Sequence, residues 1–349
     1  MVNYNKFAGK LKEDLSGFSQ KISKGMKCPA KKFILQMLYG ILESNKVHLS
    51  GIARSLEENT SLKKTIDRLS KNLSSFEGKE NIMKNYIQLV KKEINEKSSV
   101  IIIDNSDITK PCSKKMEALS DVRDGSTGEI KKGYLTIEAA VLPGDSKMPL
   151  PVYEKVFSAA EEGFLSETDE NLKCLGFLSA HFSKTCVRTL DRGFDTKDYY
   201  KYFLGRDEKF IIRAKKNRDV IYKNKTCNIM DVANKYKGNY CMGFTGRHGK
   251  KIQCKISYIS VKLCAFQQKD LILVAVYGFG KNPMMLLTNL SVHEAKDKKK
   301  LCLIVTKVYL MRWRIEEYFK FKKQQFKLED LRVMSLNSIR NLDLFATLA

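Results

Sequence analysis

A short basic segment near the end of the chain contains two adjacent carboxylates, Glu316 and Glu317. The segment, YLMRWRIEEYFKFKKQQFKLED, spans residues 309–330. As a helix it would place several cations within about three turns of these acids: Arg312, Arg314, Lys320, Lys322, Lys323 and Lys327. One interpretation is a solvated helix with i,i+4 ion pairs, Arg312–Glu316 and Glu316–Lys320. The other is a catalytic acid that holds a metal ion where phosphate groups must lie.

Two further acids follow short apolar runs that are typical of buried strands. The run SVIIID ends at Asp104, and the run TCVRTLD ends at Asp191. Side chains at strand ends point into the crevice where open α/β sheets bind their ligands. A single aspartate in this position is more often a turn or cap residue. Two such residues, together with a glutamate on a later basic helix, favour a metal site made of three carboxylates.

Helical geometry aligns part of the basic segment. At about 100° per residue, Tyr309, Glu316 and Lys323 fall close to one line, with Arg312 about 40° away. Glu317 lies about 100° off this stripe. One face therefore carries an aromatic ring, a guanidinium, a carboxylate and an ammonium, which suits a site that handles phosphates.

Composition limits the class of partner. The chain of 349 residues has a formal net charge of +24, and 43% of its residues are hydrophobic. Such a charge repels itself but favours a polyanion, because Lys and Arg release counterions from phosphates. Nucleic acid is the leading partner and an anionic membrane surface the weaker one. No apolar run approaches the roughly 18 residues that span a bilayer, and no signal peptide opens the chain.

Cysteine and histidine usage argues against zinc. The nine cysteines form no CxxC pair, and there are only four histidines. An odd, scattered set fits no disulfide framework, so we expect reduced thiols in the cytoplasm. Any metal should be a hard ion bound by oxygen.

Residues 1–97 are predicted to be helical, with a segment that resembles a helix-turn-helix at 49–73. Its second helix would bury Leu69 and present Lys63, Lys64 and Arg68 outward, as a helix that enters a DNA major groove does. A helical bundle with a basic solvent face would give the same pattern.

The rest of the chain is predicted as a mixed α/β core with an insertion. Residues 98–215 would form its first part, with strands at 99–104, 133–142, 150–157, 185–191 and 209–215 and helices after 168 and after 195. Alternating runs at 251–264 and 270–279 predict a β-rich insertion over 216–300. Residues 301–349 would form the basic helix that contains Glu316 and the start of a C-terminal helical part.

The spacing Tyr309-x2-Arg312-x3-Glu316-x6-Lys323 resembles the Tyr-Arg-Glu-Lys signature of bacterial cut-and-paste transposases of the insertion-sequence-four family. The segment IIIDNSDI, residues 101–108, looks like the strand of that family's first acid. LDRGFD, residues 190–195, is similar to the strand and turn of its second acid. The resemblance covers roughly residues 45–349, and its last motif is the most specific.

The resemblance implies a ribonuclease-H-like catalytic core with the acids Asp104, Asp191 and Glu316 as both catalytic and metal-binding residues. Two Mg²⁺ ions, which Mn²⁺ can replace, would be held by them, with Asp104 bridging. The partners would be double-stranded DNA, as terminal inverted repeats and target, and a second copy of the chain in the synaptic complex. A bacterial, nucleoid-associated location follows. Family members usually continue into a longer helical C-terminal part, so a longer natural chain is expected.

The same resemblance assigns DNA contacts. Arg312 and Lys323 would grip phosphates beside the scissile one, and Tyr309 would add a phosphate or base contact. Trp313 would either stack on a flipped base or pack in the core. Arg192 would neutralise a phosphate or pair with a neighbouring acid.

Four other acids compete for the metal: Asp107, Asp195, Glu317 and Glu154. Two other functions also remain open. A metal-dependent, structure-specific nuclease would keep the three acids without needing the signature spacing. A transposase-derived regulator with an inactive core would bind DNA ends without cutting them.

Overall fold

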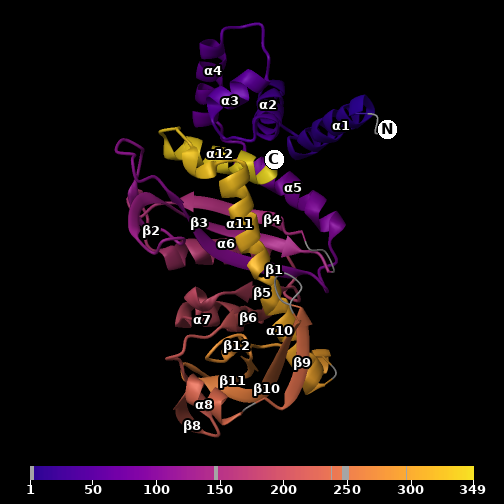
Figure 1. Ribbon diagram of the computed structural model, residues 1–349, viewed down its shortest axis with the longest axis vertical. Helices are drawn as coiled ribbons and strands as arrows, with labels where there is room; N and C mark the ends of the chain where they lie inside the picture. Colours follow the sequence, from indigo (N-terminus) through magenta and orange to yellow (C-terminus); the bar gives the residue numbers. More distant parts are fainter. Residues whose placement is uncertain (1–3, 145–147, 237, 246–250, 296) are drawn as a thin grey trace.

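The computed structural model describes residues 4–144, 148–236, 238–245, 251–295 and 297–349. The molecule is elongated, with N-terminal helices at one end, a sheet through the middle and β-hairpins at the other end (Figure 1). Helices α10, Lys298–Met311, and α11, Trp313–Gln325, run along this axis and join the parts.

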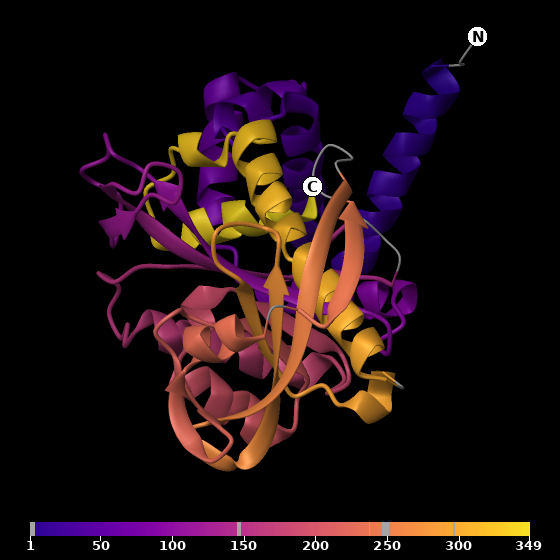
Figure 2. The same cartoon turned by 60° about the horizontal axis from the view of Figure 1, so that its bottom comes forward.

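Five helices open the described part of the chain. They are α1 Tyr4–Ile22, α2 Cys28–Ser44, α3 Leu49–Ser55, α4 Leu62–Ser74 and α5 Lys79–Glu93. Ser61 caps α4 by accepting a hydrogen bond from the backbone N–H of Lys64, which fixes the break between the two short helices. Figure 2 shows α1 projecting from the rest of the bundle.

The N-terminal helices share their core with the last helix, α12, Leu336–Leu348. The ring of Phe345 lies 5.5 Å from the rings of Phe33 and of Phe76. The side-chain amide of Asn341 donates to the carbonyl groups of Leu73 and Phe76, both at 2.9 Å. The bundle therefore packs around a helix that comes from the far end of the sequence.

The central sheet is mixed. Its strands run in the order β2-β3-β1-β5-β6-β12-β11-β10-β7-β8, with β4 paired to β3 and β9 to β10. β1 is antiparallel to β3 but parallel to β5, and β5 is parallel to β6. The first six strands are β1 Val100–Thr109, β2 Ser120–Arg123, β3 Ile130–Leu142, β4 Leu150–Phe157, β5 Val187–Leu190 and β6 Phe210–Arg213.

Side-chain alternation along β1 separates the two faces of the sheet. Ile102 packs with Ile315 of α11 on one face. Ile101 and Ile103 belong to the core of the other face, with residues of α6, Glu167–His181, and α7, Lys197–Arg206. The apolar run at 100–103 is thus buried on both faces, as expected for a strand that has parallel neighbours.

The predicted β-rich segment continues the same sheet. β10, Lys251–Leu263, and β11, Phe266–Tyr277, confirm the two alternating runs. β12 returns to pair with β6 and so joins the hairpins to the core strands. The segment also contains a helix that the sequence did not indicate, and the remaining elements here are β7 Asp219–Tyr222, β8 Lys225–Asn228, α8 Ile229–Lys235, β9 Tyr240–Thr245 and β12 Met284–Thr288.

The sequence suggested one unbroken helix for the basic segment, but the structure has two. α10 ends at Met311 and α11 begins at Trp313, with the short helix α9, Val292–Ala295, before them. Around Arg312 the backbone bonds span three residues instead of four, Arg312 to Tyr309 and Ile315 to Arg312. Such a tightened turn rotates each residue by about 120°. It therefore shifts the predicted stripe at the position of Arg312.

The end of α11 is marked by a left-handed residue, Lys327, with φ of 51°. Among the described residues, two 3-10 turns complete the elements, η1 Arg192–Phe194 after β5 and η3 Leu328–Asp330 after α11. All nine cysteines are free thiols. Within the described residues, no helix combines the length and apolarity needed to cross a bilayer.

A buried cluster of charges joins α11 to its neighbours. The ammonium of Lys322 lies 3.0 Å from Glu138 of β3 and 2.7 Å from Asp343 of α12. Lys79 of α5 pairs with Glu154 of β4 at 2.6 Å. All but Lys79 are buried in the protein interior. Buried ions are costly unless paired, so this cluster constrains how the elements meet.

The Glu154 carboxyl of this cluster has a strongly raised pKa. Burial raises its pKa from 4.5 to about 8; Lys79 and Lys322 oppose the rise, whereas Asp343 and its hydrogen bond to Glu154 add to it. At neutral pH Glu154 therefore holds a proton.

We expect Glu154→Gln to remove a pH dependence of stability. The unfolded chain releases this proton near pH 4.5, whereas the folded protein keeps it to about pH 8. The wild type should therefore lose free energy of unfolding relative to the variant as the pH rises through that interval. Urea unfolding at several pH values measures the difference. The exposed Glu162→Gln serves as control, and equal trends for both variants would contradict the prediction.

Candidate functional site

Asp104 and Asp191 lie on adjacent parallel strands. Residues 100–103 of β1 pair with 187–190 of β5, and each acid follows the last paired residue, Ile103 or Leu190. The prediction that Asp104 ends its strand is wrong, because β1 continues to Thr109 through pairing with β3. The parallel pairing, however, does end there. Both acids thus stand where β1 and β5 separate, the position at which such sheets bind ligands.

Arg312 links the first acid to the third. One terminal nitrogen of its guanidinium lies 2.5 Å from Oδ2 of Asp104, and the other pairs with Oε1 of Glu316. Arg312 is buried, whereas the Glu316 side chain is 47% exposed and so faces solvent beside the partly buried Asp104. The tight turn at Arg312 directs the guanidinium between two carboxylates that are far apart in the sequence.

Tyr309 holds the second acid. Its hydroxyl donates to Oδ1 of Asp191 at 3.0 Å. Tyr309 lies in the core shared by α10 and strands β10–β12, so the ring is fixed by packing. Tyr309, before the helix break, therefore contacts Asp191, and Arg312, at the break, contacts Asp104.

The electrostatics of these groups show how close they lie. Burial raises the pKa of Asp104 to about 6; Arg312 opposes this rise, and the charges of Asp191 and Glu316 add to it. Burial would also raise the pKa of Asp191, but Arg312 and hydrogen bonds from the Arg192 backbone and Tyr309 bring it below its ordinary value. Burial disfavours charge on Arg312, yet Asp104 and Asp191 raise its pKa, so it stays cationic.

In the part of the chain that the structure describes, no three His, Cys, Asp or Glu side chains converge closely enough to hold a metal ion. Oxygens of Asp104 and Glu316 contact the guanidinium of Arg312, and an oxygen of Asp191 contacts the phenol of Tyr309. Arg312 thus joins Asp104 to Glu316, while Asp191 is held separately by Tyr309.

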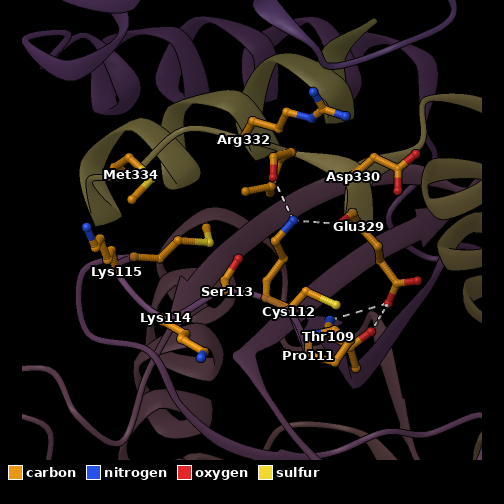
Figure 3. Close-up of a pocket in the computed structure, with 13 residues that line it drawn as sticks. Thr109, Pro111, Cys112, Ser113, Lys114, Lys115, Glu329, Asp330, Arg332 and Met334 are labelled. Atoms are coloured by element: carbon orange, nitrogen blue, oxygen red, sulfur yellow. Dashed lines mark hydrogen bonds between the residues drawn. The ribbon is translucent and has the colours of Figure 1, made fainter.

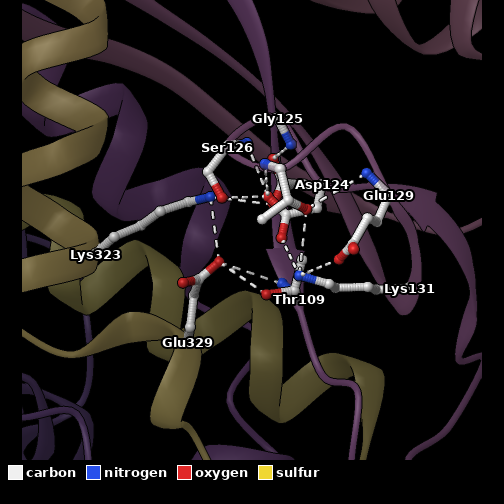
Figure 4. Close-up of polar contacts among 10 residues, drawn as sticks. Thr109, Asp124, Gly125, Ser126, Glu129, Lys131, Lys323 and Glu329 are labelled. Atoms are coloured by element: carbon white, nitrogen blue, oxygen red, sulfur yellow. Dashed lines mark hydrogen bonds and ion pairs between the residues drawn. The ribbon is translucent and has the colours of Figure 1, made fainter.

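Lys323, the last signature residue, is held by acids of its own. Its ammonium lies 3.2 Å from Asp107 and 3.2 Å from Glu329. Glu329 also accepts a hydrogen bond from the Thr109 hydroxyl at 3.2 Å (Figure 4). The neighbouring turn is closed by Asp124, which accepts from the backbone N–H of Ser126 at 2.8 Å. The sequence did not indicate Glu329, because this residue lies in the turn after the helix and so outside the helical stripe that contains Lys323.

The remaining predicted contacts are at the surface or partly covered. Trp313 is partly buried, and the guanidinium of Arg314 lies 4.3 Å from its ring centre. Arg192 is exposed, in the turn after Asp191. Neither arrangement tests the predicted role of Trp313 or Arg192 in DNA contact.

Of the basic residues on α4, Lys63 and Lys64 are exposed. Arg68 instead contacts Glu58 at 2.8 Å and the side-chain oxygen of Gln36 at 2.9 Å. Its guanidinium thus ties α4 to the turn before it and to α2. The Arg68 side chain, predicted to point outward, is 37% exposed and makes these contacts within the bundle.

The four competing acids have other partners. Asp107 pairs with Lys323, and Glu317 pairs with Arg314. Asp195 accepts from Tyr200 at 2.7 Å and pairs with Arg218 at 2.9 Å. Glu154 belongs to the buried cluster described above. None of them lies between the strands that carry Asp104 and Asp191.

A cavity of about 680 Å³ lies beside the far end of β1. Figure 3 shows its lining from the loop after Thr109 and from the segment after α11. Lys110 donates to the carbonyls of Glu329 at 2.8 Å and Leu331 at 2.6 Å, which ties the two segments together. The three acids do not line this cavity.

Comparisons with known proteins identify a family. The family model described as "Transposase DDE domain" matches residues 168–349. The matched segment includes Asp191 and Glu316 but begins after Asp104. Among curated proteins no significant match was found. A solved structure, the cryo-EM structure of piggyBac transposase synaptic complex with hairpin DNA, is similar with a TM-score of 0.42 and 10% identity, covering 91% of this chain and 70% of that one. Because the family model spans more than half of its residues, the chain belongs to the transposase DDE domain family.

Proposed function

We propose that this protein is a cut-and-paste DNA transposase of the insertion-sequence-four type, with Asp104, Asp191 and Glu316 as its catalytic acids. The observation that carries the proposal is the contact of one guanidinium, from Arg312, with both Asp104 and Glu316. Asp104 lies outside the segment that the family model matches. Its place beside Asp191 and Glu316 therefore supports the assignment independently of that match.

We further propose that β4, β3, β1, β5 and β6 form a ribonuclease-H-like core. Its support is the mixed pairing of these strands, with two acids at the point where the parallel strands β1 and β5 separate. The third acid comes from α11, which packs on the same sheet. A rigid sheet and a packed helix are the supports that a precise site needs.

The three acids suit a hard divalent ion. Carboxylate oxygens are the ligands that Mg²⁺ prefers, together with water and phosphate oxygens. Burial raises the pKa of Asp104, and the charges of Asp191 and Glu316 add to the rise. Like charges so close together favour a positive charge between them, which Arg312 supplies here. Bound Mg²⁺ would activate a water and stabilise the leaving oxygen. Asp104, Asp191 and Glu316 would hold it.

The signature cations would act on DNA. In this structure Arg312 and Lys323 are each held by two carboxylates, Arg312 by Asp104 and Glu316 and Lys323 by Asp107 and Glu329. Phosphate oxygens resemble carboxylates in charge and geometry, so DNA would compete for both side chains. We propose that the two cations move from these acids to phosphates beside the scissile bond, with the inverted repeats paired by a homodimer.

The proposal is tested by metal-dependent cleavage of the element's own DNA. The purified chain is incubated with Mn²⁺ and a supercoiled plasmid that carries the DNA flanking its gene, and the cut positions are mapped. Double-strand breaks at a pair of inverted repeats are expected. Cuts at branched structures regardless of sequence would indicate a structure-specific nuclease. Sequence-specific binding without any cut would indicate an inactive regulator.

A second prediction concerns end binding by the N-terminal helices. We expect Lys63→Ala together with Lys64→Ala to weaken binding to end DNA and to reduce the slope of log affinity against log salt by about two. Arg68→Ala should instead lower the stability of the bundle, because Arg68 contacts Glu58 and Gln36. Fluorescence anisotropy at several salt concentrations measures the slope. An unchanged slope in the double variant would exclude these lysines from the interface.

A further inference from the structure

Lys322 is a fully buried lysine on the helix that carries Glu316, and it lies six residues after that acid. Its ammonium donates to both oxygens of Glu138, at 3.0 and 3.1 Å, and to the hydroxyl of Thr347 at 3.0 Å. It also pairs with Asp343 at 2.7 Å. Burial opposes this charge, but Asp343 and Glu138 raise the pKa of Lys322, so it stays protonated. One ammonium therefore joins α11 to β3 and to α12.

The acids that meet these cations form a row across three strands. Asp104 of β1 is directly opposite Glu138 of β3, and Glu138 is directly opposite Glu154 of β4. Directly opposed residues of antiparallel strands present their side chains on the same face. Each acid in the row has its own cation: Arg312 for Asp104, Lys322 for Glu138 and Lys79 for Glu154.

Helix α11 thus meets the sheet at two charged points. Arg312, at the start of the helix, contacts Asp104, the first acid of the row. Lys322, near the end of the helix, contacts Glu138, the second acid of the row. Glu316 lies on the helix between these two contacts. The apolar contact of Ile315 with Val100 and Ile102 is not directional and by itself would permit a shift along the sheet. The two ion pairs fix both the position of the helix and its rotation.

We propose that Lys322 is a positioning residue, which holds the helix of Glu316 against β3 so that this acid stays beside Asp104. This inference rests on the proposed function, because the contacts of Lys322 with Glu138 and Asp343, here called the tether, would position an acid of the proposed active site. Catalytic groups must be held to within about 0.5 Å. A surface pair such as Arg314–Glu317 on the same helix cannot supply that restraint, since exposed side chains exchange with water.

The test uses a variant that removes the tether together with one of its two buried carboxylates, Lys322→Met with Glu138→Gln. Asp343 loses its ion pair with Lys322 and keeps Glu154 as a neighbour. Lys155→Met is the matched control, because Lys155 ties the same sheet to α6 through Glu170, away from α11. Three quantities are measured for each protein: the rate of DNA cleavage, the affinity for the same DNA, and amide hydrogen exchange in residues 313–325.

The double variant should cleave at least about tenfold more slowly than wild type, since small displacements of reacting groups cost up to about a hundredfold. Its affinity for DNA should be unchanged, and exchange in α11 should be faster. Cleavage at the wild-type rate, or an equal loss in Lys155→Met, would overturn the positioning role. If the wild type cuts no DNA, the proposed function fails, and exchange in α11 alone then decides the tether: faster exchange supports it and unchanged exchange refutes it.

Discussion

Glu316→Gln is expected to slow metal-dependent DNA cleavage by roughly a thousandfold or more. Glutamine keeps the size of the side chain but removes the negative charge that would hold a divalent ion, and each tenfold loss corresponds to about 1.4 kcal/mol of barrier. Affinity for DNA should stay the same or rise, because the variant repels phosphates less. Single-turnover cleavage and anisotropy, on the same DNA, separate the two effects.

The neighbouring acid offers a matched control. Glu317 is equally exposed on the same helix but pairs with Arg314, so Glu317→Gln should cleave at close to the wild-type rate. The two variants differ by one position and leave the same net charge. A reversed result, with Glu317→Gln inactive and Glu316→Gln active, would move the site to the other side of the helix.

Lys322→Met alone should lower the free energy of unfolding by about 3–5 kcal/mol, the usual effect of leaving a buried ion without its partner. Both Glu138 and Asp343 would keep their carboxyl groups in the interior without the ammonium that lies 3.0 and 2.7 Å from them. Urea unfolding at neutral pH measures the change. Adding Glu138→Gln should recover part of the loss.

A partly exposed lysine on the same sheet sets the scale for this result. Lys155 pairs with Glu170, and its side chain is 28% exposed, so Lys155→Met should cost no more than about 1 kcal/mol. Equal losses for Lys155→Met and Lys322→Met would mean that water reaches the Lys322 cluster. The interior description of that cluster would then be wrong.

The sequence indicated the acids of the candidate site because their types and spacing are local properties. A β-branched run before Asp104, a similar run before Asp191 and the signature around Glu316 are each contained in a few residues. Their convergence, however, depends on Arg312, whose contact with Asp104 joins segments that are distant in the chain. Helical periodicity placed Arg312 about 40° from the line of Glu316 on the assumption of an unbroken helix, and the tight turn at Arg312 changes that angle.

The buried cluster could not be predicted in the same way. Lys322 lies in a run of cations, and such a run is typical of a solvated face. Its partners Glu138 and Asp343 come from a strand and from the last helix, so no local pattern connects them. The sequence leaves Glu154 among the acids that compete for the metal, although alternation along its strand could point it outward. Its pairing with Lys79 depends on how α5 packs on β4.

The packing of α12 inside the N-terminal bundle has a consequence for the order in which the protein can fold. Phe345 completes the aromatic contact of Phe33 with Phe76, yet it is made long after both of them. During translation the helices at 28–74 leave the ribosome before residues 336–348, so the apolar side chains that α12 covers stay exposed in the meantime. The bundle therefore completes its core only after the strands of the central sheet have been made.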